Sequence, residues 1–219
     1  MKAIFQKSEN HWAFQPIQNP EIPKSGSHSA IDAFVGQSLQ EESLDFAKPA
    51  NRQTMIRRLY HDLIGLKPTF NQVNAFVNDQ TPNAYAKIVD QLLNSPRFGE
   101  RWGRHWLDVA RYADTKGYLA GGESRTYPYA YTYRDWVIKA FNKDLPYDEF
   151  IRQQMAADFL TEQPNHPDLA ALGFLTAGPV FLNRRQLIID DQIDLVTRGL
   201  MGFTVACARR HDHFHDPIP

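Results

Sequence analysis

Apolar residues return every three or four positions through most of this chain. This spacing places them on one face of an α-helix, whereas a half-buried strand needs strict alternation of apolar and polar residues. No segment alternates in that way, and no internal repeat occurs. The pattern therefore predicts an all-α fold, a multi-helix orthogonal bundle of about eight helices.

Proline, glycine and capping residues divide the helical pattern into segments. Asn51 and Thr69 are expected N-caps, Ser95 with Pro96 opens the longest segment, and Gly65 ends an earlier one. The expected helical segments cover roughly residues 31–39, 51–63, 69–77, 82–93, 98–113, 131–142, 146–159, 170–175 and 190–206.

Three of these segments carry apolar stripes that predict core faces. The stripe of the 98–113 helix has members spaced by four, three and four residues, and it predicts a single buried face. The predicted inward residues are Trp102, Trp106, Val109 and Ala113 in that helix, Phe150, Ile151, Met155 and Phe159 in the 146–159 helix, and Ile193, Val196, Leu200 and Phe203 in the last.

Residues 1–30 differ from the rest of the chain. Pro16, Pro20 and Pro23 fix the backbone in extended conformations and remove hydrogen-bond donors. We therefore expect an extended, proline-rich N-terminal arm over residues 1–30 and a helical domain over residues 31–219.

Composition limits the classes of partner. The net charge is −1, so the chain has no basic field to attract nucleic acid or an anionic membrane. No apolar run approaches the roughly 18 residues of a membrane span, and the first ten residues contain no signal-peptide core. We expect neither nucleic acid nor a membrane as partner. A single cysteine excludes an intramolecular disulfide.

Residues 207–216 have the densest group of possible ligands in the chain. Cys207 and His211 stand as in the haem-attachment pattern Cys-x-x-Cys-His, but Arg210 replaces the second cysteine. One interpretation is haem c held by Cys207 and His211.

A second interpretation of this segment is a divalent metal site. His211, His213 and His215 alternate, so in an extended chain they share one face. Asp212 and Asp216 would complete the site or orient the imidazoles. A third interpretation is structural, with the histidines bonded to backbone and Cys207 packed as a small apolar residue.

A weaker candidate site lies on the polar side of the 98–113 helix. His105 and Asp108 have the spacing of an acid–base pair, and Arg134 follows in a nearby helix. The glycine-containing loop at residues 115–128 would lie beside them. The alternative is a network of ion pairs that ties helices together. The pattern assigns no enzymatic activity.

Several long motifs resemble one family, the planctomycete-type cytochrome domain of unknown function (PSCyt). They are HWAFQP at residues 11–16, RRLYHDLIGL at 57–66, ERWGRHWLDVARYAD at 100–114, YRDWV at 133–137, and residues 207–217. Members of this family are usually parts of exported multidomain proteins, and they continue into a second domain. The resemblance thus implies a shortened relative or an excised domain, exported to the periplasm or beyond, although its N-terminus shows no signal.

Two functions follow as expectations. The first is a cytochrome-like module of a redox or extracellular-degradation system, with haem or a metal bound by the histidine-rich C-terminal segment. The second is a non-catalytic structural domain that packs against a C-terminal partner domain. The expected partner is that domain or a redox protein.

Overall fold

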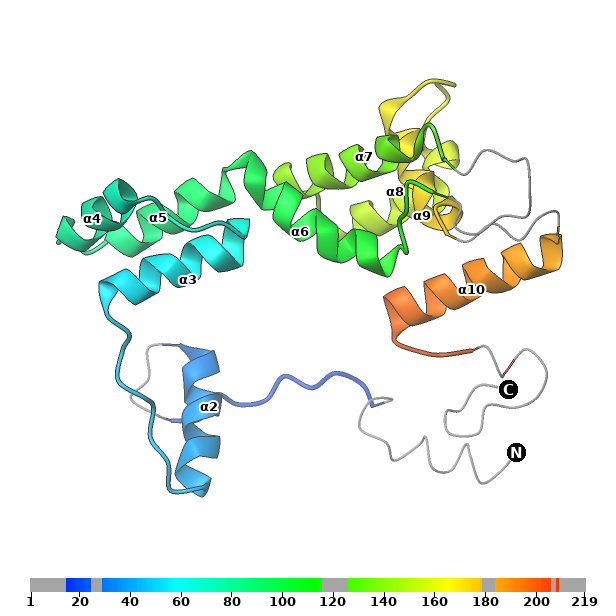
Figure 1. The fold of residues 1–219 in the computed structure, drawn as a ribbon. Helices are drawn as coiled ribbons and strands as arrows, with labels where there is room; N and C mark the ends of the chain where they lie inside the picture. The colour runs from blue at the N-terminus through cyan, green and yellow to red at the C-terminus, as the bar shows by residue number, and fades with distance from the viewer. Residues whose placement is uncertain (1–14, 25–28, 116–125, 179–183, 206–207, 209–219) are drawn as a thin grey trace. The chain divides into compact units, whose positions relative to one another are not determined.

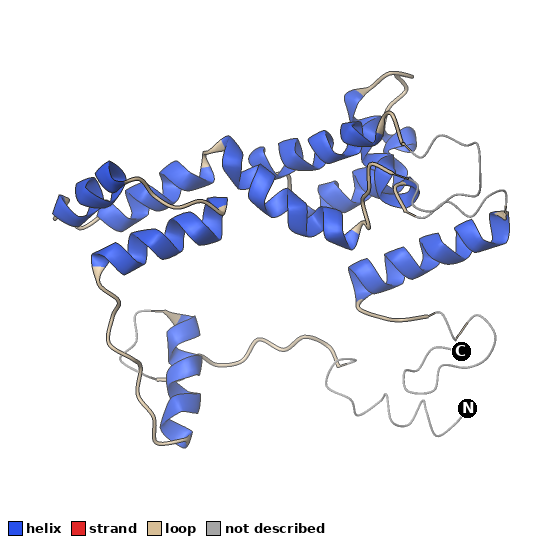
Figure 2. Ribbon diagram, viewed as in Figure 1, coloured by secondary structure: helices blue, strands red, loops and turns tan. Residues whose placement is uncertain are grey.

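The computed structural model describes residues 15–24, 29–115, 126–178, 184–205 and 208, and it is 65% helical. Helices follow one another along the described chain (Figures 1 and 2), and their only β pairing is an isolated bridge between Thr115 and Thr126. The predicted all-α fold is confirmed. No helix within these ranges is long and apolar enough to cross a membrane.

The chain divides into two compact units, one of residues 1–51 with 213–219 and one of residues 52–212. In the first unit, residues 15–24 have no regular structure, and helix α2 spans Ala30–Glu41. The Ser29 side chain caps α2 by accepting a hydrogen bond from the backbone N–H of Asp32. Only Ala33 of α2 is buried.

The second unit begins with three short helices, α3 (Arg52–Ile64), α4 (Phe70–Asn78) and α5 (Ala84–Leu93). Thr69 and Gln72 form the capping box that starts α4. The Arg52 guanidinium donates to the carbonyls of Phe76 and Asp79, and it lies 4.2 Å from the centre of the Phe76 ring. The helices share a core of Ile56, Tyr60, Phe76, Ala84 and Leu92.

Helix α6 (Pro96–Val109) packs along α7 (Ala130–Asn142) (Figure 1). Gly99 and Gly103 of α6 lie at this contact. A Cβ added at Gly99 would lie 2.7 Å from the Asn142 side chain and closer still to the Ile138 carbonyl oxygen. The Gly99 N–H also donates to Asn142 Oδ1 at 2.8 Å. The bare glycine face therefore lets the two backbones approach closely.

This packing corrects the predicted core stripe of the 98–113 helix. Trp102 and Val109 are 39% and 38% exposed, Ala113 is exposed, and only Trp106 packs against the core. The helix also ends earlier than predicted, at Val109, because Arg111 adopts a left-handed φ of 56° that α-helical backbone does not allow.

Three further helices and a 3-10 turn complete the unit: α8 (Tyr147–Leu160), η2 (Pro167–Leu172), α9 (Gly173–Thr176) and α10 (Arg185–Met201). Their buried residues join those of α7 in one core. Its fully buried members are Ala110, Tyr133, Trp136, Val137, Ala140, Phe150, Ala157, Ala171, Phe174 and Leu195.

Two predicted core faces in these helices are partly wrong. Met155 and Phe159 of α8 are exposed. For Phe159 the reason is the kink at Ala156, whose non-helical angles change the face of the last turn. Helix α10 begins at Arg185 rather than near residue 190 and ends at Gly202, whose φ is 72°. Within it Ile193 is 42% exposed and Leu195 is buried instead.

Candidate functional site

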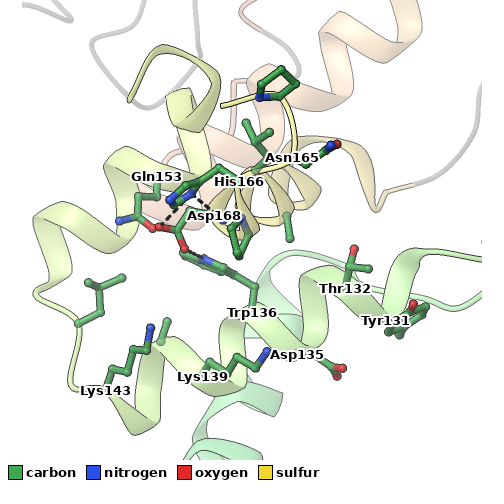
Figure 3. Close-up of a pocket in the computed structure, with 16 residues that line it drawn as sticks. Tyr131, Thr132, Asp135, Trp136, Lys139, Lys143, Gln153, Asn165, His166 and Asp168 are labelled. Carbon is green, nitrogen blue, oxygen red and sulfur yellow. Dashed lines mark hydrogen bonds and ion pairs between the residues drawn. The ribbon is translucent and has the colours of Figure 1, made fainter. Parts of the chain in front are cut away.

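A cleft of about 740 Å³ lies between α7, α8 and the segment that leads into η2. Figure 3 shows Lys139 and Lys143 on one side, with Gln153, His166 and Asp168 across from them and the Trp136 indole between. The cleft is within the range of small-molecule sites, and both charged and apolar groups line it.

Asp168 is the centre of the polar wall. The Trp136 indole N–H donates to Asp168 Oδ1 at 3.2 Å, so a residue of α7 fixes one carboxylate oxygen. The backbone N–H of Asp168 donates to His166 Nδ1 at 3.2 Å. His166 Nδ1 also lies 3.6 Å from Asp168 Oδ2. Because Nδ1 accepts a bond, the neutral imidazole of His166 carries its proton on Nε2.

The opposite wall is cationic. Lys139 lies in the last turn of α7 and Lys143 caps its end; both are exposed, and neither forms an ion pair in the described part of the chain. Asp135 also lines the cleft, and its carboxylate lies 3.0 Å from the Arg134 guanidinium. The arrangement offers an imidazole donor, a carboxylate acceptor and two ammonium groups to a polar ligand.

A buried polar network supports Trp106 and Tyr133 beneath this region. Gln154, which is fully buried, accepts hydrogen bonds from the Trp106 indole and the Tyr133 hydroxyl, both at 2.7 Å. Its own amide nitrogen donates to the Phe150 carbonyl at 3.0 Å. Burial raises the pKa of Tyr133, so its hydroxyl stays a donor. Each described polar group of the network is therefore satisfied within the core.

The predicted helix-face residues do not meet in this structure. His105 is exposed and its ring lies 5.5 Å from that of Trp102, and no ion pair joins it to Asp108 among the residues described. Arg134 bonds to its neighbour Asp135, which raises the pKa of Arg134. These groups form structural contacts within single helices.

Arg111 and Tyr112, which follow the predicted residues of α6 in the chain, both make polar side-chain contacts. Arg111 forms a two-pronged ion pair with Asp191 of α10, with one N–O distance of 2.9 Å. The Tyr112 hydroxyl donates to Asp114 at 2.5 Å, and burial together with this bond raises the pKa of Tyr112 to about 12. The ion-pair interpretation thus fits Arg111 well.

The predicted haem and metal ligands lie outside the described residues. These are Cys207, His211, Asp212, His213, His215 and Asp216. Over the ranges that are described, no group of three or more His, Cys, Asp or Glu side chains is close enough to hold a metal ion.

Sequence reasoning missed the cleft of Figure 3. Trp136 and Asp168 are 32 residues apart, and nothing in the local pattern joins them. The only sequence signal was His166 before Pro167, a helix start in which the imidazole acts as cap.

Comparison with known proteins identifies a family. Residues 30–219 match PSCyt2, described as a protein of unknown function (DUF1549). No curated protein and no solved structure matches the chain.

Proposed function

We propose, from the premise that this chain belongs to the PSCyt2 family, that it is an interaction domain whose exposed helix α10 packs against a C-terminal partner domain. The observation that carries the proposal is the apolar surface of α10. Family resemblance supplies the partner, since members of the family usually continue into a second domain.

Helix α10 buries little of its apolar surface. Of its 17 residues only Leu195 is fully buried. Val196 and Leu200 pack partly against the core, and the Arg111–Asp191 pair and a bond from Gln192 to the Leu175 carbonyl add polar contacts. Its large exposed apolar residues are Leu187, Ile188, Ile189, Ile193 and Met201. Scattered exposed residues are ordinary, but several on one helix are typical of an interaction site.

A binding measurement tests this proposal. A second domain from a family member is titrated onto the chain and onto the double variant Ile189→Ser/Ile193→Ser. We expect the Kd of the double variant to rise at least about tenfold, because both positions lose apolar contact area with the partner. Gln186→Ser, on the same exposed turn, is the matched control and should bind like the unaltered chain. Equal binding by both variants, or no binding by the unaltered chain, would contradict the proposal.

A second candidate function rests on residues 207–216, which contain six possible ligands. We propose that this segment binds a divalent metal as part of a redox or extracellular-degradation system. Imidazole and carboxylate donors suit zinc or a similar ion. They fit haem c less well, because the chain has one cysteine and covalent attachment normally uses two.

Elemental analysis and absorption spectra of the purified chain test the second candidate. We expect stoichiometric metal that is lost in His211→Ala/His213→Ala and retained in His61→Ala, a surface histidine of α3. A metal-free protein would refute metal binding. For haem, a Soret band in Arg210→Cys made with haem-attachment machinery would favour a cytochrome relationship, and a colourless variant would count against it.

A further inference from the structure

A second hollow shares Ala140 and Leu145 with the cleft, includes no residue of α10, and is lined mainly by aromatic side chains. This groove has a volume of about 550 Å³ and lies where α6, the end of α7 and the start of α8 meet. Its aromatic wall consists of Phe98, Trp106, Phe141, Tyr147 and Phe150. Tyr147 is exposed, and Phe98, Trp106 and Phe141 are half-buried, so four of these rings keep surface that a ligand can reach, while Phe150 is buried behind them.

The floor of the groove is fixed in place. The Trp106 ring lies 4.8 Å from Phe150 edge-on and 5.6 Å from Phe174 in a stack. Its indole N–H is engaged by buried Gln154, so the ring cannot turn. Phe141 meets Phe150 edge-on at 5.7 Å. A ligand would therefore meet a preformed surface and would not have to order it.

The rim adds one phenol and one carboxylate. Tyr147 is 64% exposed, and its hydroxyl makes no hydrogen bond to the described residues. Asp144, in the turn after α7, lines the same groove, is exposed and forms no ion pair there. The rim thus offers a donor for a backbone carbonyl and a negative charge for a basic side chain.

We propose that this groove binds an extended, proline-containing segment of a partner chain that carries a lysine or arginine beside the prolines. Proline-rich segments adopt polyproline II conformation before binding, so they lose little entropy when their rings dock between aromatic side chains. Their carbonyls stay unpaired and can accept from a phenol such as Tyr147. The Asp144 carboxylate complements the basic residue, which sets the orientation of the segment.

A synthetic peptide with this chemistry serves as the probe. The sequence of residues 15–24, QPIQNPEIPK, contains three prolines and a terminal lysine. It is titrated onto the full chain carrying Pro16→Ala, Pro20→Ala and Pro23→Ala, so that the protein's own copy of these prolines cannot compete. Tryptophan fluorescence reports binding, because Trp106 lines the groove.

We expect saturable binding that falls about tenfold when the peptide prolines become alanine, and about tenfold again in Tyr147→Ala. Asp144→Asn should remove most of the salt dependence, and asparagine tolerates the left-handed φ of 51° at this position. Tyr85→Ala, an exposed tyrosine on α5, is the matched control and should bind normally. Circular dichroism checks that each variant is folded.

Two results would overturn the inference. One is the absence of saturable binding by the proline peptide. The other is equal binding of the proline and alanine peptides, which would indicate a general apolar surface such as a site for a helix or for a second copy of the chain.

Discussion

Helices α7 and α10 contribute to the same core but are held in different ways. Helix α7 buries four of its 13 residues, whereas α10 buries one of 17. Both sequences are rich in apolar residues, so apolar content does not explain the difference. Helix α7 lies against the glycine face of α6, where the backbones approach closely. Helix α10 buries only Leu195, packs Val196 and Leu200 partly against the core, and adds one ion pair. Burial depends on what the neighbouring helix offers.

The largest expected effect comes from a variant that breaks the contact between Gly99 of α6 and helix α7. Gly99→Ala should lower the free energy of unfolding by about 3 kcal/mol or more, because its Cβ would overlap the α7 backbone. At Gly103 the nearest atom is 3.4 Å away, so Gly103→Ala should be neutral or stabilising by up to about 1 kcal/mol. Urea unfolding of both variants measures this, and equal effects would show that α6 and α7 do not pack through Gly99.

The next effect concerns the anchor of α10. Leu195→Ala should cost about 2–4 kcal/mol, because a buried side chain is lost. Ile193→Ala, two residues earlier and exposed, should change stability by about 0.5 kcal/mol or less. Thermal and urea unfolding compare the two. A larger loss from Ile193 than from Leu195 would reverse the burial described for α10.

A third variant tests the polar network behind α7. Gln154→Leu removes the acceptor shared by Trp106 and Tyr133. The Trp106 indole can still donate to the Tyr133 hydroxyl at 3.2 Å, so the Tyr133 hydroxyl is the donor left without a partner, at a cost of about 1–3 kcal/mol. Gln153→Leu on the same helix, where the side chain bonds only to Glu149, should cost less than about 1 kcal/mol. Chemical denaturation followed by tryptophan fluorescence distinguishes them. A neutral Gln154→Leu would mean that the network does not stabilise the core.

A fourth pair of variants measures how much the Arg111–Asp191 ion pair contributes to holding α10. Asp191→Asn should cost about 1 kcal/mol, because Arg111 is partly buried and loses its charged partner. Asp194→Asn removes a pair with exposed Arg198 within the helix, so it should cost about 0.3–0.5 kcal/mol or less. Both losses are measured by urea unfolding at low and high salt. Equal losses would mean that Arg111 does not fix α10.

The smallest effect is at alkaline pH. The pKa of Tyr112 is about 12 when folded and about 10 in an unfolded chain, so the folded state holds the proton more tightly. The contribution of the Tyr112 hydroxyl to the free energy of unfolding is fully present below pH 10 and is lost as the pH rises through 12. Tyr112→Phe should lose less stability over that window, as measured by urea unfolding at each pH. Ionisation of Tyr112 near pH 10, seen by absorbance at 295 nm, would refute the raised value.

Local signals in the sequence located most helices correctly. The Thr69 capping box, the Ser95 cap with Pro96 and the left-handed Gly65 each stand where a helix begins or ends. Such signals act within a few residues, so the sequence contains them in full. The glycine spacing at Gly99 and Gly103 was also visible, but the tryptophan stripe on the same helix suggested a different core face.

The candidate site could not be predicted from the sequence, because its residues come together only in the folded chain. Trp136 and Asp168 meet only because η2 returns to α7, and the aromatic groove combines three helices. The kink at Ala156 turned the end of α8 outward against its own periodicity. The C-terminal ligands remain a prediction from sequence.

By itself the sequence determined an all-helical chain, the start and end of most helices, and membership of the PSCyt2 family. Only the tertiary structure decided which faces are buried, that Gly99 rather than Trp102 meets α7, and where the cleft and groove lie. The physical reason is the distance along the chain over which each kind of interaction acts. Caps and periodicity arise from interactions within one or two helical turns, whereas burial and cavities depend on side chains that are brought together from distant parts of the chain.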